Sequence, residues 1–292
     1  MRIAVTGRNG QVVQSLIERA PARGHVVMSL GRPEFDLAEG ASVRAALIAA
    51  KPDAIVSAAA YTAVDKAESE REMAFAVNAA GAGAVAEAAA ALGVPLVHLS
   101  TDFVFDGTKS APYVETDPTG PLGVYGASKL AGEQAVLAAH ADSVILRTAW
   151  VYSPFGANFL KTMLRLAADR DELGVVADQF GNPTGALDIA DAVLQVAERL
   201  AEDPSPDLRG VFHMTAAGDT SWAGFAEAIF AASAARGGPS AHVRHITTAE
   251  YPTPATRPGN SRLDCTKLAN AYGIRLGAWQ HAVDLSVARH LS

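Results

Sequence analysis

Three side chains near the middle of the chain have the chemistry needed to reduce a carbonyl group. Tyr125 and Lys129 stand four residues apart, so in a helix they share one face, one turn apart. An ammonium beside a phenol is expected to pull the pKa of the phenol from its usual value of about 10 toward working pH. Thr101 ends an apolar run that reads as a buried strand. Together these groups can polarise a carbonyl and protonate its oxygen as hydride arrives, which requires a nicotinamide cofactor.

The amino terminus supplies a site of the right kind for such a cofactor. Residues 3–6 predict a first strand, and Gly7 and Gly10 open a helix expected over 10–23. Glycines at this point let the backbone approach a pyrophosphate at the helix N-terminus. Val13 stands where a third glycine often allows close helix–strand packing, so the packing here is expected to differ. The spacing also occurs in ordinary turns, but its position directly after the first strand favours a cofactor loop.

The end of the second expected strand, at 26–30, is where the choice of cofactor is usually made. An acid there bonds the ribose diol, whereas an arginine accommodates a 2′-phosphate. The strand runs into Gly31 and Arg32 with no acid at its tip. Arg32 therefore favours NADPH as the hydride donor, with NADH as an alternative. The competing interpretation is that Arg32 is a solvated loop residue with no role in cofactor choice.

Small residues leave the third expected strand and would let the backbone lie along a dinucleotide. The charged residues that follow, Asp65, Lys66 and Glu68, are interpreted individually as solvated. The predicted cofactor site comprises Gly7, Asn9, Gly10, Gln11, Val12, Arg32, Asp36, Leu37, Ala58, Ala59, Ala60, Tyr61, Tyr125 and Lys129.

Expected strands and helices alternate through the first half of the chain. Short, uniformly apolar strands indicate burial on both faces, and this alternation predicts a Rossmann-like, doubly wound parallel sheet of the α/β class. The strands are expected at 3–6, 26–30, 54–58, 95–100 and 143–147, with helices at 10–23, 41–50, 65–92 and 125–139. We expect a cofactor domain over 1–150 and a smaller mixed α/β substrate lobe over 151–292, with the chain crossing back between them. In the second part, helices are expected at 158–168, 188–201 and 221–235, a strand at 211–214 and a Pro-rich loop at 251–259.

Composition excludes several classes of protein. The 292 residues are 49% hydrophobic and 19% charged, with a net charge of −7, which argues against nucleic acid as a main partner. The single Cys265 excludes an internal disulfide and a multi-cysteine metal site, and the chain starts with a strand rather than a signal peptide. A cytoplasmic protein is expected. The Ala-rich segment 79–94 contains Glu87 and three glycines, so a packed helix explains it better than a membrane span.

With these residues assembled, the chain resembles the extended short-chain dehydrogenase/reductases. Its tyrosine–lysine pair is common to that superfamily. The stretches 257–261, Arg-Pro-Gly-Asn-Ser, and 179–185, Gln-Phe-Gly-Asn-Pro-Thr-Gly, are similar to the branch that reduces sugar nucleotides. Within that branch the resemblance is to the reductases that make dTDP-L-rhamnose, and it covers nearly the whole chain.

The resemblance implies hydride transfer from NAD(P)H to C4 of dTDP-6-deoxy-L-lyxo-4-hexulose. Tyr125 would donate the proton, Lys129 would hold the nicotinamide ribose, and Thr101 would orient the substrate oxygen; a turn cap is the alternative for Thr101. Trp150 would form an apolar wall against the deoxysugar, or else belong to the core. Asn158 and Arg257 would touch the diphosphate, which suits the planar fork of an arginine. The implied substrate residues are Thr101, Asp102, Phe103, Tyr125, Trp150, Asn158, Arg257, Asn260 and Ser261.

The same resemblance raises the question of a metal at a subunit interface. Some members of the family bind magnesium between two subunits through glutamates, but two aligned positions here are Ser15 and Leu187. Since neither is a carboxylate, no protein-bound metal is expected. Magnesium would enter only with the substrate diphosphate. We expect a monomer, or a dimer that magnesium does not bridge.

Two other functions are compatible with these motifs. The nearest alternative is another extended reductase, or an epimerase, that acts on a nucleotide-activated 4-keto sugar. An epimerase would also carry Tyr125 and Lys129 but would retain its cofactor through the cycle. A non-catalytic regulatory subunit on this fold would commonly lose the proton donor, whereas this chain keeps Tyr125, Lys129 and Thr101.

Overall fold

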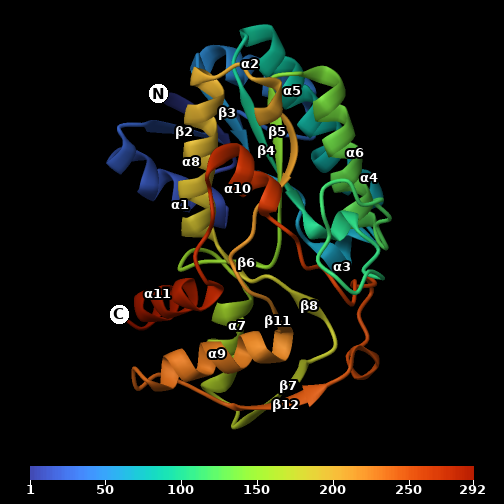
Figure 1. The fold of residues 1–292 in the computed structure, drawn as a ribbon, viewed down its shortest axis with the longest axis vertical. Helices are drawn as coiled ribbons and strands as arrows, with labels where there is room; N and C mark the ends of the chain where they lie inside the picture. Colours follow the sequence, from blue (N-terminus) through green and yellow to red (C-terminus); the bar gives the residue numbers. More distant parts are fainter.

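A computed structural model describes all 292 residues, and the upper lobe in Figure 1 is built on one sheet. The sheet has six strands in the order β10-β5-β4-β3-β1-β2, and every neighbouring pair is parallel. This confirms the predicted Rossmann-like α/β class. The strands are β1 (Arg2–Thr6), β2 (Val26–Leu30), β3 (Ala54–Ser57), β4 (Leu96–Thr101), β5 (Ser143–Thr148) and β10 (Gly210–His213).

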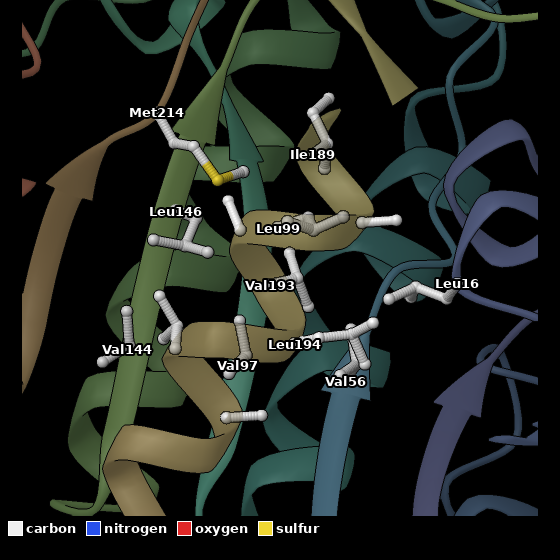
Figure 2. Packing of buried hydrophobic residues seen from close by; sticks show 14 of the residues in the cluster. Leu16, Val56, Val97, Leu99, Val144, Leu146, Ile189, Val193, Leu194 and Met214 are labelled. Atoms are coloured by element: carbon white, nitrogen blue, oxygen red, sulfur yellow. The ribbon is translucent and has the colours of Figure 1, made fainter. Parts of the chain in front are cut away.

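Both faces of the sheet are buried because successive side chains along a strand point to opposite faces. Ile3 and Val5 of β1 face one hydrophobic cluster, and Ala4 between them faces another. On the first face lie α1 and α8; Figure 2 shows α8 across the strands, with Leu194 of α8 next to Val56 of β3. On the second face lie α2, α5 and α6. Apolar strands thus require helices on both sides, as the fold class demands.

The helices of this layered lobe agree with the expected ranges to within a few residues. A continuous helical stretch, Arg71–Leu92, is long and apolar enough to cross a membrane by length and composition alone. Its last part is α5, which packs against α2 and α6 and buries Val85, Ala86 and Ala89 completely. The structure therefore uses it as a core helix. The helices are α1 (Gln11–Arg19), α2 (Gly40–Ala50), α3 (Val64–Ala67), α4 (Arg71–Phe75), α5 (Gly81–Leu92), α6 (Val124–Ala139) and α8 (Ala186–Glu202).

The lower lobe in Figure 1 has its own core. Phe225, Ile229 and Trp279 are buried there with neighbours from three helices and a two-stranded parallel sheet. That sheet and the two C-terminal helices were not expected from the sequence. The elements are α7 (Phe159–Ala167), α9 (Trp222–Ala234), α10 (Thr266–Tyr272), α11 (Trp279–Leu291), β7 (Glu172–Val176) and β12 (His242–Ile246), with short strands β6 (Val151–Tyr152), β8 (Phe180–Gly181), β9 (Thr184–Gly185) and β11 (Thr220–Ser221).

The chain passes between the lobes several times after residue 150. Helix α8 and strand β10 belong to the upper lobe, since α8 covers its sheet and β10 pairs with β5. Leu268 of α10 is also buried in that core. The stretch 151–292 is thus shared between the lobes, and the carboxyl edge of the parallel sheet faces the lower lobe.

Candidate active site

Strand β4 and helix α6 position the three candidate catalytic residues. Thr101 is the last residue of β4, where the strand reaches the carboxyl edge of the sheet, while Tyr125 and Lys129 lie in the first two turns of α6. The Thr101 hydroxyl donates to Asp102 Oδ1 at 2.8 Å and accepts from the backbone N–H of Phe103 at 3.2 Å. Thr101 therefore does cap the short turn that follows, and it also places a hydroxyl at the site.

The contact between that turn and α6 is close. A Cβ on Gly126 would lie 2.1 Å from the carbonyl oxygen of Phe103, so only glycine fits there. The ring of Phe103 meets the ring of Tyr125 edge-on, with centroids 5.8 Å apart. The Thr101 turn and the Tyr125 helix are thereby fixed against each other.

The environment of Tyr125 differs from the sequence prediction. Burial raises the pKa of Tyr125 to about 12, the Thr101 hydroxyl acts in the opposite direction, and the charge of Asp102 adds to the rise. The expected lowering by Lys129 is wrong for this arrangement, because desolvation dominates and the ammonium is directed elsewhere. A phenol with this pKa stays protonated across the working range, although it is a weaker acid than one whose pKa lies near that range.

Lys129 is buried at 3% exposure. Its Nζ donates to the carbonyl oxygen of Leu99 on β4 at 2.7 Å and lies 3.4 Å from Nε2 of His98. Burial lowers the pKa of Lys129 to about 8, and the charge of Glu133 one turn further along α6 opposes this. The ammonium is thus held behind Tyr125 with its charge partly supported by a carboxylate.

Glu133 is in turn held by a buried ion pair that the sequence did not reveal. Its two carboxylate oxygens accept from Arg147 Nε at 2.9 Å and Nη2 at 2.6 Å, and the Ser100 hydroxyl donates to Oε1 at 2.5 Å. The side chains of Arg147 and Glu133 are 5% and 3% exposed. Strands β4 and β5 and helix α6 are therefore tied together by charge directly behind the catalytic residues.

The loop after β1 has the geometry of a cofactor loop. Gly7 has a φ of +99°, a conformation that favours glycine. The Thr6 hydroxyl accepts the backbone N–H groups of Ala58 and Ala59 at 2.9 Å each, which joins the ends of β1 and β3. Ligands of open parallel sheets bind where neighbouring connections diverge, and β1 and β3 flank that point here. Val13, in the place of a third glycine, is buried in the core.

A cavity of about 640 Å³ opens at this edge of the sheet and fits the adenosine part of a dinucleotide. Arg32 and Arg8 both line it. Arg8, which the sequence analysis did not single out, pairs with Glu34 at 2.6 Å. Gln11 lies outside the lining and connects the lobes, since its side chain donates to Val151 O and accepts from Ser153 and Asn158. Of the predicted cofactor residues, Gly7, Asn9, Arg32, Asp36, Leu37, Ala59, Ala60 and Tyr61 line the cavity, whereas Gly10, Gln11, Val12, Ala58, Tyr125 and Lys129 do not.

The whole chain, residues 1–292, matches the sequence model of the family described as RmlD substrate binding domain. A dTDP-4-dehydrorhamnose reductase from Sinorhizobium fredii is 56% identical over 97% of this chain and 95% of that protein. The Escherichia coli K12 enzyme of that name is 43% identical over 97% and 96%.

This chain belongs to the dTDP-4-dehydrorhamnose reductase family.

Solved structures agree with this assignment. A dTDP-4-dehydrorhamnose reductase from Clostridium acetobutylicum superposes with a TM-score of 0.93 at 34% identity, covering all of both chains. One from Bacillus anthracis, solved in complex with NADP, gives a TM-score of 0.91 at 34% identity over 98% of each chain. The predicted resemblance is confirmed.

In this member of the reductase family, the predicted substrate residues differ from one another in their environments. Trp150 leaves β5 with a φ of +46° and stacks on Trp222 of α9, with ring centroids 3.6 Å apart. Asn158 caps α7 by accepting the Lys161 N–H at 3.1 Å, so its amide is engaged by protein. Asn260 donates to the backbone of Lys109 and Ala111. Asn158 and Asn260 thus hold loops, which leaves their predicted contacts with substrate untested.

Asp102 lies beside Thr101 and is almost fully buried. Its Oδ2 has no hydrogen-bond partner. Burial raises the pKa of Asp102 to about 6, while the hydroxyls of Ser261 and Thr101 counteract the rise. The Asp102 carboxylate is thus buried at the end of β4, close to the hydroxyls of Thr101 and Ser261.

A second cavity, of about 480 Å³, lies in the lower lobe and is lined by both apolar and charged side chains. Phe159 and Trp222 contribute aromatic rings, and Arg170 and Arg257 contribute guanidinium groups. Arg257 is the only predicted substrate residue among its lining. The sequence had given no signal for Trp222, because no spacing links α9 to Trp150.

Asp65 and Glu68, which were interpreted individually as solvated, are partly exposed but each also binds another part of the protein. Asp65 forms a two-pronged ion pair with Arg257, at 2.8 and 3.0 Å. Glu68 accepts the backbone N–H of Val124 at the start of α6, at 2.8 Å. Lys66 and Glu68 are both exposed, and Lys66 pairs with Glu70. The partners lie far away in sequence, so local pattern carried no sign of them.

Proposed function

We propose that this chain reduces the C4 keto group of dTDP-6-deoxy-L-lyxo-4-hexulose with NADPH and so forms dTDP-L-rhamnose. The observation that carries the proposal is the convergence of Thr101, Tyr125 and Lys129 at the carboxyl end of β4. Its relatives of the same length carry the name of that reductase.

Each residue has a separate task in this proposal. NADPH, when bound, supplies the hydride. Tyr125 donates its phenolic proton to the C4 oxygen, and its raised pKa keeps that proton in place until charge develops on the oxygen. The Thr101 hydroxyl orients the oxygen, and Lys129 holds the nicotinamide ribose and contributes positive charge.

The two cavities divide the substrates between the lobes. The upper cavity takes the adenosine end of the cofactor, where Arg32 and Arg8 suit a 2′-phosphate. The lower cavity takes the nucleotide of the sugar substrate, with Trp150 and Trp222 beside the deoxysugar. We propose that residues 1–150 with α8 and β10 bind cofactor and that the remainder of 151–292 binds the sugar nucleotide. Cytoplasmic placement and the absence of a magnesium bridge between subunits stay predictions.

A turnover assay tests the function directly. Purified protein is mixed with the dTDP-4-keto-6-deoxy sugar and either NADPH or NADH, and loss of absorbance by the reduced nicotinamide is followed. Sustained consumption of NADPH in step with product supports a reductase. An epimer of the sugar nucleotide formed without net consumption of cofactor identifies an epimerase, and no turnover with either cofactor overturns the proposal.

The proton donor is tested by Tyr125→Phe. Loss of the phenol should lower kcat by about 10²-fold or more, the usual scale for a general acid. Binding of NADPH should be retained, because the phenol does not form the phosphate site. Turnover near that of the unaltered protein would refute the assignment of Tyr125.

A further inference from the structure

The Pro-rich strap, residues 251–259, crosses the mouth of the site between two functional regions. On one side Ala255, Thr256 and Pro258 lie with Tyr125 and Phe103 around a small cavity. On the other side Tyr251, Thr253 and Arg257 line the lower cavity. The strap therefore touches both the surroundings of the proton donor and the site proposed for the sugar nucleotide.

The middle of this strap is tied to the rest of the protein through one carboxylate. The ends are held by other contacts: Tyr251 N–H donates to Thr248 O, and Gly259 O accepts from Phe180. Between them, every hydrogen bond that residues 252–258 make outside their own segment goes to Asp65. Three of these seven residues are prolines, which have no N–H to donate.

The bonds to Asp65 use both the backbone and the side chain of the strap. Ala255, which is buried, donates its N–H to Asp65 Oδ1 at 3.2 Å. Arg257 Nη1 and Nη2 donate to Oδ1 and Oδ2 at 3.0 and 2.8 Å. The guanidinium holds the pKa of Asp65 below its usual value, so the carboxylate stays charged at neutral pH.

The same contacts leave part of Arg257 free. Its Nη1 also donates to Thr253 Oγ1 and Ala255 O within the strap, whereas its Nε has no hydrogen-bond partner in the protein. The side chain is 24% exposed and borders the lower cavity. Asp65 thus fixes the guanidinium, while the Nε–H and the second N–H of Nη2 have no acceptor in the protein and remain available to an anion.

Asp65 stands on α3, directly after the chain that borders the cofactor cavity. Tyr61 and Lys66 line that cavity on either side of Asp65 in sequence. Glu68, at the other end of α3, holds the start of α6 next to Tyr125. In Figure 1 the orange-red chain runs beside α3, far from it in sequence.

We propose that Asp65 is a positioning residue of the sugar-nucleotide site, which holds the strap and directs Arg257 toward the diphosphate of the substrate. This inference rests on the proposed function. Substrate affinity then depends on a carboxylate that never touches the substrate. Because α3 adjoins the upper cavity, the strap is held by the same segment that borders the site proposed for the dinucleotide.

The test compares Asp65→Asn, Asp65→Glu and Arg257→Gln with the unaltered protein. Asp219→Asn is the matched control, since Asp219 also faces an arginine, Arg262, and has similar exposure, 45% against 41%. The KM for the dTDP sugar should rise about tenfold or more in Asp65→Asn, the scale of a lost bond to a charged group. The kcat should fall by less than the KM rises, and the KM for NADPH should be unchanged. Asp65→Glu should recover part of the loss, and Asp219→Asn should behave like the unaltered protein.

A second measurement needs no turnover. Hydrogen exchange of the peptide covering 251–259 reports five amides, those of Thr253, Ala255, Thr256, Arg257 and Gly259. Exchange there should accelerate at least tenfold in Asp65→Asn, with little change elsewhere. If this occurs in a protein that does not reduce the keto sugar, the tether stands and the proposed function fails.

The double variant separates positioning from general support of the fold. Asp65→Asn combined with Arg257→Gln should have the same KM as Arg257→Gln alone, because Asp65 acts through Arg257. Additive losses would overturn the proposal. Unchanged exchange of 251–259 together with an unchanged KM in Asp65→Asn would overturn it as well.

Discussion

Removing the carboxylate of Glu133 should destabilise the protein far more than removing a surface charge. Glu133 and Arg147 are 3% and 5% exposed, and the carboxylate receives two bonds from the guanidinium and one from Ser100. In Glu133→Ala the Arg147 guanidinium stays buried and loses the two carboxylate oxygens that accept from its Nε and Nη2. Its Nη1 has no hydrogen-bond partner even in the unaltered protein. Breaking a buried pair in this way costs about 3–5 kcal/mol.

The assay is urea unfolding followed by circular dichroism, with thermal unfolding alongside. A loss of this size should lower the unfolding temperature by roughly 10 °C in a chain of this length. The control is Arg199→Ala, which removes an exposed pair with Asp203 and should cost less than about 1 kcal/mol. The double variant Glu133→Leu with Arg147→Met should recover most of the stability, since apolar replacements of a buried pair are often neutral.

The same carboxylate should influence catalysis through Lys129. Glu133 opposes the effect of burial, which brings the pKa of Lys129 to about 8. Glu133→Gln removes the negative charge that raises the pKa of Lys129, so this pKa should fall. The decline of kcat at alkaline pH should then begin at a lower pH. A stability loss in Glu133→Ala no larger than in Arg199→Ala would refute the reasoning, as would an unmoved alkaline decline of kcat in Glu133→Gln.

Three further outcomes are expected. In the unaltered protein, activity should decline as pH rises through about 8, because Lys129 is charged below its pKa and neutral above it. Tyr125, with a pKa of about 12, keeps its proton throughout. A pH profile in which activity falls only near pH 10 would contradict this. Arg32→Ala and Arg8→Ala should each weaken NADPH binding roughly tenfold and NADH binding much less, and equal losses in calorimetry would exclude them as selectors. Sedimentation in magnesium and then in EDTA should give the same oligomeric state, since Ser15 and Leu187 supply no carboxylate. A dimer that dissociates in EDTA would show that magnesium does bridge the subunits.

The layered first lobe could be predicted from the sequence because its signals are local. Apolar strands at 3–6 and 143–147 can only be buried between helices, and Gly24 ends its helix with a φ of +71° as a C-terminal glycine should. The spacing of Tyr125 and Lys129 fixes them on one helix face whatever lies around them. Small errors at the ends of helices come from capping and do not alter the arrangement.

The lower lobe was less accessible to sequence reasoning. Strands β7 and β12 are 70 residues apart at Glu172 and His242, and they pair in parallel at the surface of the lobe. The sequence of β12 mixes polar and apolar residues, and the short apolar run of β7 does not indicate its partner strand. Pairing between such distant segments depends on the packing of α7, α9 and α11 around Phe225, which no local pattern encodes.

The sequence by itself determined which reactive groups this protein has, their order, and the fold that carries them, because residue type, helical spacing and strand burial are local properties. Only the tertiary structure decided their state. It placed Glu133 against Arg147 and Asp65 against Arg257, and it raised the pKa of Tyr125 where a lowered value was expected. Charge interactions and desolvation depend on distance through space and on access to water, and both are set only when segments remote in the chain pack together.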